Sequence, residues 1–289
     1  MRDSDKGMLF VGISALTFGV TPLLTMLVYR AGCNPPTLLL LRHLIGLPVF
    51  LLPARRGIAE TVRGHVVRLT VLGLLCCTVT PLLLAVAYLH LASGMVTTLH
   101  FVYPMFTFLL EVLLFGAPCR LRRLLCYAAC TLGVFLLQGA HGGGSLRGAA
   151  LALASGFAYA CYIALFDRSG LSALDPFAID AYFYLVSAAA SFVWCLAAGF
   201  TLSLPPAAWA ILVLYAVLIA LGGTAAFQLG IGLLGGQRAA LFSCLEPILS
   251  VVLGAVFLHE RVTPAALLGT AVILFSITAA TMPDRKRRV

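Results

Sequence analysis

Ten apolar segments limit this chain to a membrane fold. A helix needs about 20 apolar residues to cross the hydrocarbon core of a bilayer. The segments cover residues 8–28, 35–53, 67–89, 94–116, 122–140, 148–166, 176–199, 207–230, 238–258 and 264–282. Only 10% of the chain is charged and 62% is hydrophobic, whereas a soluble domain carries about 25% charged residues. We therefore expect an all-α integral membrane protein with ten transmembrane helices, solvated by the lipid bilayer.

The basic residues lie between these segments and indicate how the chain is oriented. Cytoplasmic loops of membrane proteins are enriched in Lys and Arg. With the N-terminus in the cytoplasm, 15 of the 19 basic residues fall on the cytoplasmic side, three fall outside and Arg42 lies within a segment. We expect a multi-pass protein of the cell inner (cytoplasmic) membrane with both termini cytoplasmic. The net charge of +9 does not indicate nucleic-acid binding, because the basic residues form no single patch with interleaved aromatics.

The nine cysteines and six histidines do not predict a metal or catalytic site. A zinc site needs four ligands at short, regular spacings, and no CxxC pair occurs. No Walker motif is present, so we expect no ATP hydrolysis by this chain and no cofactor. A membrane-embedded enzyme is the less favoured alternative, because its ligands or carboxylates would cluster. We do not expect an enzyme.

An internal repeat relates residues 142–289 to residues 1–141. At an offset of about 141–143 residues, Pro104 meets Pro247 and Pro35 meets Pro176. Each half holds five segments, an odd number, so the halves are inverted relative to each other. Inverted repeats are the architecture of secondary transporters, whose substrate site lies near the midplane between the repeats. A duplicated scaffold without transport is the alternative.

The second half also carries a recognisable motif. It reads Leu245-Glu246-Pro247-Ile248-Leu249, then Phe257-Leu258-His259-Glu260-Arg261-Val262-Thr263, then Gly269. With it, nearly the whole chain resembles the EamA-like family of the drug/metabolite transporter superfamily, although Ala117-Pro118 replaces a Glu-Arg pair in the first half. The resemblance implies a central cavity lined mainly by spans 1, 3, 4, 6, 8 and 9. It also implies efflux of amino acids, nucleobases, vitamins or other small metabolites.

Polar residues within the segments are the candidate site residues, because a polar side chain in hydrocarbon normally faces protein or water. The fourth segment carries His100, Tyr103, Thr107 and Glu111. Their steps of three, four and four place them on one helix face. The repeat maps them onto Ser243, Glu246, Ser250 and Gly254. We expect the two stripes to form opposite walls of a cavity, unless the hydroxyls bond their own helix carbonyls.

Glu246 and His100 are the candidates for coupling transport to protons. Glu246 lies well inside the ninth segment, where it could hold a proton or pair with an amino group of a substrate. The alternative is a structural role beside Pro247, which removes a helix hydrogen bond. His100 is the second titratable candidate, with a satisfied structural histidine as its alternative. Glu111 lies near the cytoplasmic end, and we expect it to pair there with arginines of residues 120–123.

Four further residues complete the predicted substrate site: Phe18, Tyr88, Tyr159 and Gln228. Aromatic rings stack on planar or amine substrates, although rings in a bundle also serve as packing. For Arg42 we favour snorkelling toward the outer interface over binding of an acidic substrate group. We expect it not to pair with Asp180, because the topology puts the two near opposite membrane faces.

These observations predict a secondary transporter that exports small organic metabolites such as amino acids by alternating access. Export of amine or cationic drug-like compounds, or transport of nucleobases or vitamins, is the alternative on the same fold. The segments at 122–140 and 264–282 are rich in small residues and are candidates for a homodimer contact. The sequence leaves the substrate, the direction and the coupling ion open.

Overall fold

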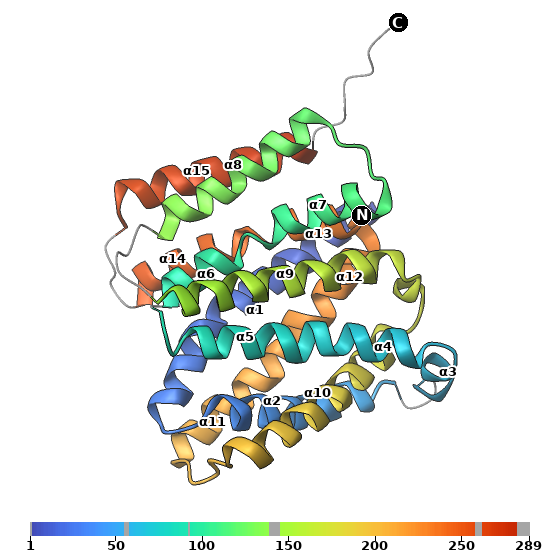
Figure 1. Ribbon diagram of the computed structural model, residues 1–289, viewed down its shortest axis with the longest axis vertical. Helices are drawn as coiled ribbons and strands as arrows, with labels where there is room; N and C mark the ends of the chain where they lie inside the picture. The colour runs from blue at the N-terminus through green and yellow to red at the C-terminus, as the bar shows by residue number, and fades with distance from the viewer. Residues whose placement is uncertain (1, 55–57, 92, 139–144, 258–261, 282–289) are drawn as a thin grey trace, which may run out of the picture.

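The computed structural model is built from helices alone in the part of the chain that it describes (Figure 1). It describes residues 2–54, 58–91, 93–138, 145–257 and 262–281, with the side chains of residues 93, 94, 138, 250, 253–257 and 281 left out. The expected all-α fold class is confirmed. Within these described ranges, six helical stretches are long and apolar enough to cross a membrane, and two shorter apolar helices accompany them.

Each predicted segment coincides with one helix or with helices that follow each other directly. Continuous helices are α1 (Asp3–Arg30), α2 (Pro35–Leu51), α8 (Leu121–Gln138), α9 (Leu146–Arg168), α10 (Pro176–Ala198) and α15 (Pro264–Thr281). The third segment is α4 (Val66–Gly73), η1 (Leu74–Val79) and α5 (Thr80–Ala87), and the fourth is α6 (Ser93–His100) and α7 (Tyr103–Phe115). The eighth is α11 (Pro206–Leu218), η3 (Ile219–Ala225) and α12 (Ala226–Leu234), and the ninth is α13 (Gly236–Phe242) and α14 (Leu245–Phe257). Two short helices, α3 (Ile58–Arg63) and η2 (Leu171–Ala173), lie in connections.

Local sequence sets where these helices begin. Asn34 and Asp175 cap α2 and α10 by accepting backbone N–H groups at 3.0 Å, and a proline follows each cap. Proline fits the first turn of a helix because its missing N–H has no partner there. Asp3 and Asp5 lie in the first turn of α1, where their negative charges interact favourably with the positive end of the helix dipole. Helix α1 therefore starts five residues before the predicted apolar segment.

The two halves share their irregularities as well as their regular helices. The third and eighth segments each contain a π-helix, η1 and η3, between two α-helices. The fourth and ninth segments each break, at Phe101–Val102 and at Ser243–Cys244. Pro104 and Pro247 stand in the first turn after these breaks. π-Helices are rare and are frequent at functional sites, so their occurrence at equivalent positions marks these spans as functional.

The halves interlock, with each first helix packed into the other half. Helix α1 packs on α12 and α14, while its repeat equivalent α9 packs on α5 and α7. Helices α1 and α9 cross the bundle in opposite directions (Figure 1), as inverted repeats require. The predicted boundary between residues 141 and 142 lies in the segment 139–144, outside the described residues.

Two pairs of repeat-equivalent helices flank this interlocked centre. Helix α2 packs against α10, and α8 packs against α15. Gly133 and Gly269 let α8 and α15 cross closely, since a Cβ at Gly269 would lie 2.5 Å from the carbonyl oxygen of Gly133. The small residues of these two helices therefore serve a contact within the chain. A homodimer through the same helices stays a prediction.

Candidate functional site

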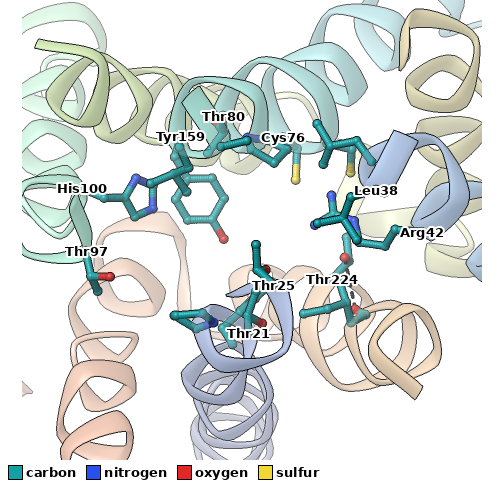
Figure 2. Close-up of a pocket in the computed structure, with 18 of the residues that line it drawn as sticks. Thr21, Thr25, Leu38, Arg42, Cys76, Thr80, Thr97, His100, Tyr159 and Thr224 are labelled. Atoms are coloured by element: carbon teal, nitrogen blue, oxygen red, sulfur yellow. Dashed lines mark hydrogen bonds between the residues drawn. The ribbon is translucent and has the colours of Figure 1, made fainter. Parts of the chain in front are cut away.

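A cavity with about 140 Å³ of space for water-sized molecules lies in the middle of the bundle. Both halves line it, through α1, α2, η1, α5, α6, α7, α9, α10, α11, η3, α12 and α14. Figure 2 shows Arg42 on one side and His100 and Thr97 on the opposite side, with Tyr159, Thr21 and Thr25 between them. The lining includes the expected spans 1, 3, 4, 6, 8 and 9 and adds α2 and α10 of spans 2 and 7.

Aromatic rings form much of the cavity wall. Seven of the chain's nine tyrosines line it, together with Phe18, Phe101 and Phe227. The ring of Tyr159 meets Tyr103 edge-on at 5.0 Å between centroids and stacks on Phe227 at 5.8 Å. Such rings present an apolar surface with hydroxyl groups at intervals. The wall therefore suits an organic molecule with a substantial apolar part better than a hydrated ion.

Arg42 is the cationic group of the cavity. Its side chain is 8% exposed, so the predicted snorkelling is wrong. It donates to the Tyr215 hydroxyl at 3.3 Å and to Nε2 of His43 at 3.2 Å, and its Nε has no partner. Arginine only donates, so His43 accepts at Nε2 and is neutral. Tyr215 holds the guanidinium in the aromatic wall, and no carboxylate of the described residues pairs with it.

Glu246 and His100 line the cavity from the helix breaks. The Ser155 hydroxyl donates to the carbonyl of Ala152 at 2.7 Å, so it accepts from Nδ1 of His100 at 2.8 Å. Nε2 of His100 is then the acceptor of a neutral ring. Glu246 is half-buried, and no hydrogen bond or ion pair within the described residues reaches its carboxylate. Tyr103 and Tyr159 lie close enough to interact with it electrostatically.

The structure brings together most, but not all, of the predicted substrate-binding residues. Those that line the cavity are Phe18, Tyr88, His100, Tyr103, Tyr159 and Glu246. Thr107 and Ser243 do not line it, and each hydroxyl donates to the carbonyl four residues earlier, at 2.9 Å. Gln228 is buried outside the lining and donates to Asp180. The side chain of Ser250 lies outside the described residues.

The predicted stripe of the fourth segment lines the cavity only in part, because His100 and Tyr103 line it from either side of the helix break, whereas Thr107 and Glu111 lie further along α7 and do not. The steps from His100 to Glu111 assume one continuous helix, but α6 ends at His100 and α7 begins at Tyr103. Beyond the break Glu111 turns to the end of α9, where it accepts from Nη2 of Arg168 at 2.6 Å. An ion pair is present as expected, although its partner is Arg168 and not an arginine of residues 120–123.

A third stripe, in α1, escaped the sequence interpretation. Phe18, Thr21, Thr25 and Tyr29 all line the cavity. Their steps of three, four and four are the spacing that drew attention to the fourth segment. Other lining residues outside the predicted site include Arg42, Tyr184 and Tyr215, and of these three only Arg42 carried a sequence signal, as a charge within an apolar segment.

The cavity extends toward one end of the bundle. Its lining includes Tyr29 near the end of α1, Leu38 near the start of α2 and Tyr88 just after α5. At the opposite end α9 packs on α12 and α13, and η2 packs on α12. The repeat equivalent of this packing would be a contact of α1 with α5 and α6. No comparable contact occurs in the part of the chain that the structure describes. The bundle is therefore closed at the end where α9 terminates.

Comparison with known proteins agrees with this architecture. The model of the EamA-like transporter family matches residues 5–138 and again residues 146–282. The chain belongs to the EamA-like transporter family. A relative that is 27% identical, the uncharacterized transporter YcbK of Bacillus subtilis (strain 168), aligns with 96% of the chain and 93% of its own length. The uncharacterized transporter sll1319 of Synechocystis sp. (strain ATCC 27184 / PCC 6803 / Kazusa) is 32% identical over 68% of the chain and 60% of its own length.

A solved crystal structure also shares the fold of this EamA-like transporter. It superposes with a TM-score of 0.76 at 21% identity and covers 97% of each chain. The family and the names of both relatives denote transporters, as does the repeat of helices around a central cavity. The chain is thus a multi-pass membrane transporter.

Proposed function

We propose that this transporter exports a small zwitterionic metabolite of the amino-acid type by alternating access. The observation that carries the proposal is that a guanidinium group, of Arg42, and a carboxyl group, of Glu246, line one cavity with aromatic walls. Arg42 and Glu246 both line it, and neither has an ion-pair partner among the described residues. A buried charge without a partner costs several kcal/mol. Each of the two charges is therefore best satisfied by a group that the substrate brings.

The two ends of the cavity differ in what they bind. The guanidinium of Arg42, held by Tyr215, offers its donors to a carboxylate. The carboxylate of Glu246, flanked by Tyr103 and Tyr159, accepts from an ammonium group, and the rings add cation–π attraction. The aromatic wall between them suits an apolar side chain. A purely cationic substrate would leave Arg42 uncompensated, which disfavours the alternative of cationic drug-like compounds.

The excess of basic residues in alternate loops supports cytoplasmic termini in the inner membrane. In that orientation the closed end of the bundle, where α9 terminates, faces the cytoplasm and the cavity faces outward. The bundle is then in an outward-facing state, with the inward-facing state reached by rocking of the two repeats. Export takes the substrate in the inward-facing state and releases it in the outward-facing one.

The test is counterflow into liposomes that contain the purified protein, with matched substrate series. One series comprises an apolar amino acid, the amine that lacks its carboxylate and the acid that lacks its amine. We expect counterflow of the amino acid. The change Arg42→Gln should reduce counterflow of the amino acid at least about tenfold, since one charged hydrogen bond is worth about 1.5–3 kcal/mol, and spare the amine. Glu246→Gln should have the opposite preference and spare the acid.

The change Thr107→Ser is the matched control, because Thr107 is a polar residue of the same bundle outside the cavity lining. It should leave all rates unchanged. Equal loss of every compound in both charge variants would reduce Arg42 and Glu246 to structural roles. If nucleobases or quaternary amines show counterflow and amino acids do not, that class is the substrate and the proposed zwitterionic substrate is wrong.

A further inference from the structure

Asp180 and Gln228 form a buried polar pair on the closed side of the cavity. Asp180 is fully buried in α10, and Gln228 is 2% exposed in α12. Nε2 of Gln228 donates to Oδ1 of Asp180 at 2.5 Å. Neither residue lines the cavity, but Cys77 and Tyr162, which do, are near enough to interact with Asp180 electrostatically. The pair thus lies one layer of side chains away from the substrate site.

Each member of the pair has one oxygen without a partner. These atoms are Oδ2 of Asp180 and Oε1 of Gln228. When the carboxyl group is ionised both oxygens are acceptors only, so they cannot satisfy each other. No lysine, arginine or histidine of the described residues forms an ion pair with Asp180. An ionised carboxylate in this position would be a buried charge held by a single amide donor, which is strongly unfavourable.

A single proton satisfies both oxygens at once. A carboxylic acid and a primary amide form a cyclic pair in which the amide N–H donates to one carboxyl oxygen and the acid O–H donates to the amide carbonyl. The observed bond from Nε2 to Oδ1 is one half of that ring, and a proton on Oδ2 would complete it with Oε1. We propose that Asp180 is a proton-binding site of the transport cycle and that it carries its proton in the outward-facing state.

The position of Asp180 gives the proton a route of release. It lies on α10 five residues after the cap at Asp175, on the side of the bundle that is closed by the packing of α9 and η2 on α12. Opening of that side admits water to the pair, and hydration favours the ionised carboxylate. The proton then leaves to the side opposite the cavity, and it returns from the cavity side when the inner side closes. Together with the proposed export, this exchanges one substrate outward for a proton inward.

No titratable group of the described residues near the pair forms an ion pair with Asp180. The groups facing it are Cys76 and Cys77 of η1, Tyr162 of α9 and Tyr184 of α10. Beyond Tyr184 lie Arg42 and His43 of α2, and His43 is held neutral by its bond from Arg42. Asp175 caps α10, and the side chains of Glu60, Arg63 and Arg68 on α3 and α4 are exposed. None of these supplies a hydrogen-bond donor to Oδ2 of Asp180.

The site is tested by difference infrared spectroscopy of the protein in liposomes, titrated from acidic to alkaline pH without any substrate. We expect a carboxylic-acid carbonyl band that persists at neutral pH. Asp180→Asn should abolish this band, while Asp175→Asn, which keeps the cap on the same helix, should leave it unchanged. Gln228→Leu removes the amide partner and should shift the frequency of the band. This variant tests the proposal if Asp180→Asn does not fold. A band that survives in Asp180→Asn, or that disappears in Glu246→Gln instead, would overturn the proposal.

A second measurement addresses coupling. In liposomes with an imposed pH gradient, wild type should accumulate an amino acid against its concentration, and Asp180→Asn should retain counterflow but lose accumulation. Accumulation by Asp180→Asn at the wild-type level would overturn the coupling role. If the infrared band belongs to Asp180 but no amino acid is transported, the proton site stands and the proposed substrate class fails.

Discussion

At the scale of single residues, charged side chains in this bundle differ in whether the protein itself compensates them. Glu111 has Arg168 at 2.6 Å, while Arg42 and Glu246 face a cavity and Asp180 has only an amide. The ion pair between Glu111 and Arg168 links α7 to α9 and therefore joins the two halves. No described residue supplies an opposite charge to the other three, and such residues are the ones that transport can use.

The ion pair between Glu111 and Arg168 should contribute to the stability of the folded protein. Glu111 is 2% exposed, and one of its oxygens already lacks a partner. The change Arg168→Gln leaves its charge buried and unpaired, so we expect a loss of about 2 kcal/mol of stability. Glu111→Gln removes the buried charge and should cost less than about 1 kcal/mol. Thermal unfolding in detergent measures both, and an equal effect of the two variants would contradict the asymmetry.

Single residues were predictable where their spacing alone placed them. Phe18 and Tyr159, which lie 141 positions apart and therefore at the repeat offset, both line the cavity. Thr107 and Ser243 were misplaced because sequence spacing predicts which face of a helix a residue is on, but not which residues of that face reach the cavity. Arg42 was misjudged because a long side chain can either reach the interface or fold inward, and the choice depends on Tyr215, which lies 173 positions away in sequence.

At the scale of helices, close crossings decide which positions tolerate a side chain. A Cβ at Gly269 would lie 2.5 Å from the backbone of Gly133 and Leu137, which cannot move independently of α8. We expect Gly269→Ala to destabilise the protein by about 1–3 kcal/mol, as overpacked cores do. In Gly12→Ala nothing lies within 4 Å of the new Cβ, so this variant should gain about 0.5–1 kcal/mol from helix propensity. Thermal unfolding should show a lower midpoint for Gly269→Ala and a higher one for Gly12→Ala. An unchanged midpoint for Gly269→Ala would show that α8 and α15 can separate.

Helix positions were the most predictable level of the structure, because lipid imposes both length and apolarity. The segment predicted at 176–199 is the helix Pro176–Ala198, and that predicted at 35–53 is Pro35–Leu51. The π-helices η1 and η3 were not predicted, since neither LLCCTV nor IALGGTA carries a proline or a charge to mark a change of helical period. The breaks at Phe101–Val102 and Ser243–Cys244 come just before Pro104 and Pro247, whose missing N–H groups weaken the helix at these points.

At the scale of the whole molecule, the state of the bundle is set by which end is closed. Ser172 of η2 meets α12 at Gly232, where a Cβ would lie 3.3 Å from the Ser172 Cβ. Disulfides join Cβ atoms about 3.5–4.5 Å apart, so these two positions need to move apart by only a few tenths of an ångström. In a variant without the nine native cysteines, Ser172→Cys with Gly232→Cys should therefore form a disulfide on oxidation. Because the lock holds one end shut, transport should fall to background and return with a reductant.

The same locked protein offers a second readout. A cysteine at the cavity residue Thr25 should still react with a thiol reagent that cannot cross the membrane, added from outside. Loss of that labelling on oxidation would contradict an outward-facing cavity, as would full transport by the locked protein. The single variant Ser172→Cys controls for the effect of the substitution itself.

The interlocking of the halves also determines how the protein can be made. Helix α1 leaves the ribosome first, yet α12, on which it packs, follows only after residues 31–225. At synthesis rates of about 5–20 residues per second, α1 waits in the bilayer for roughly 10–40 s. During that wait the hydroxyls of Ser14 and Thr25 lack Gly223 and Tyr215, their later partners. The two halves can thus enclose the substrate chamber only after α11, η3 and α12 have followed α1 into the bilayer.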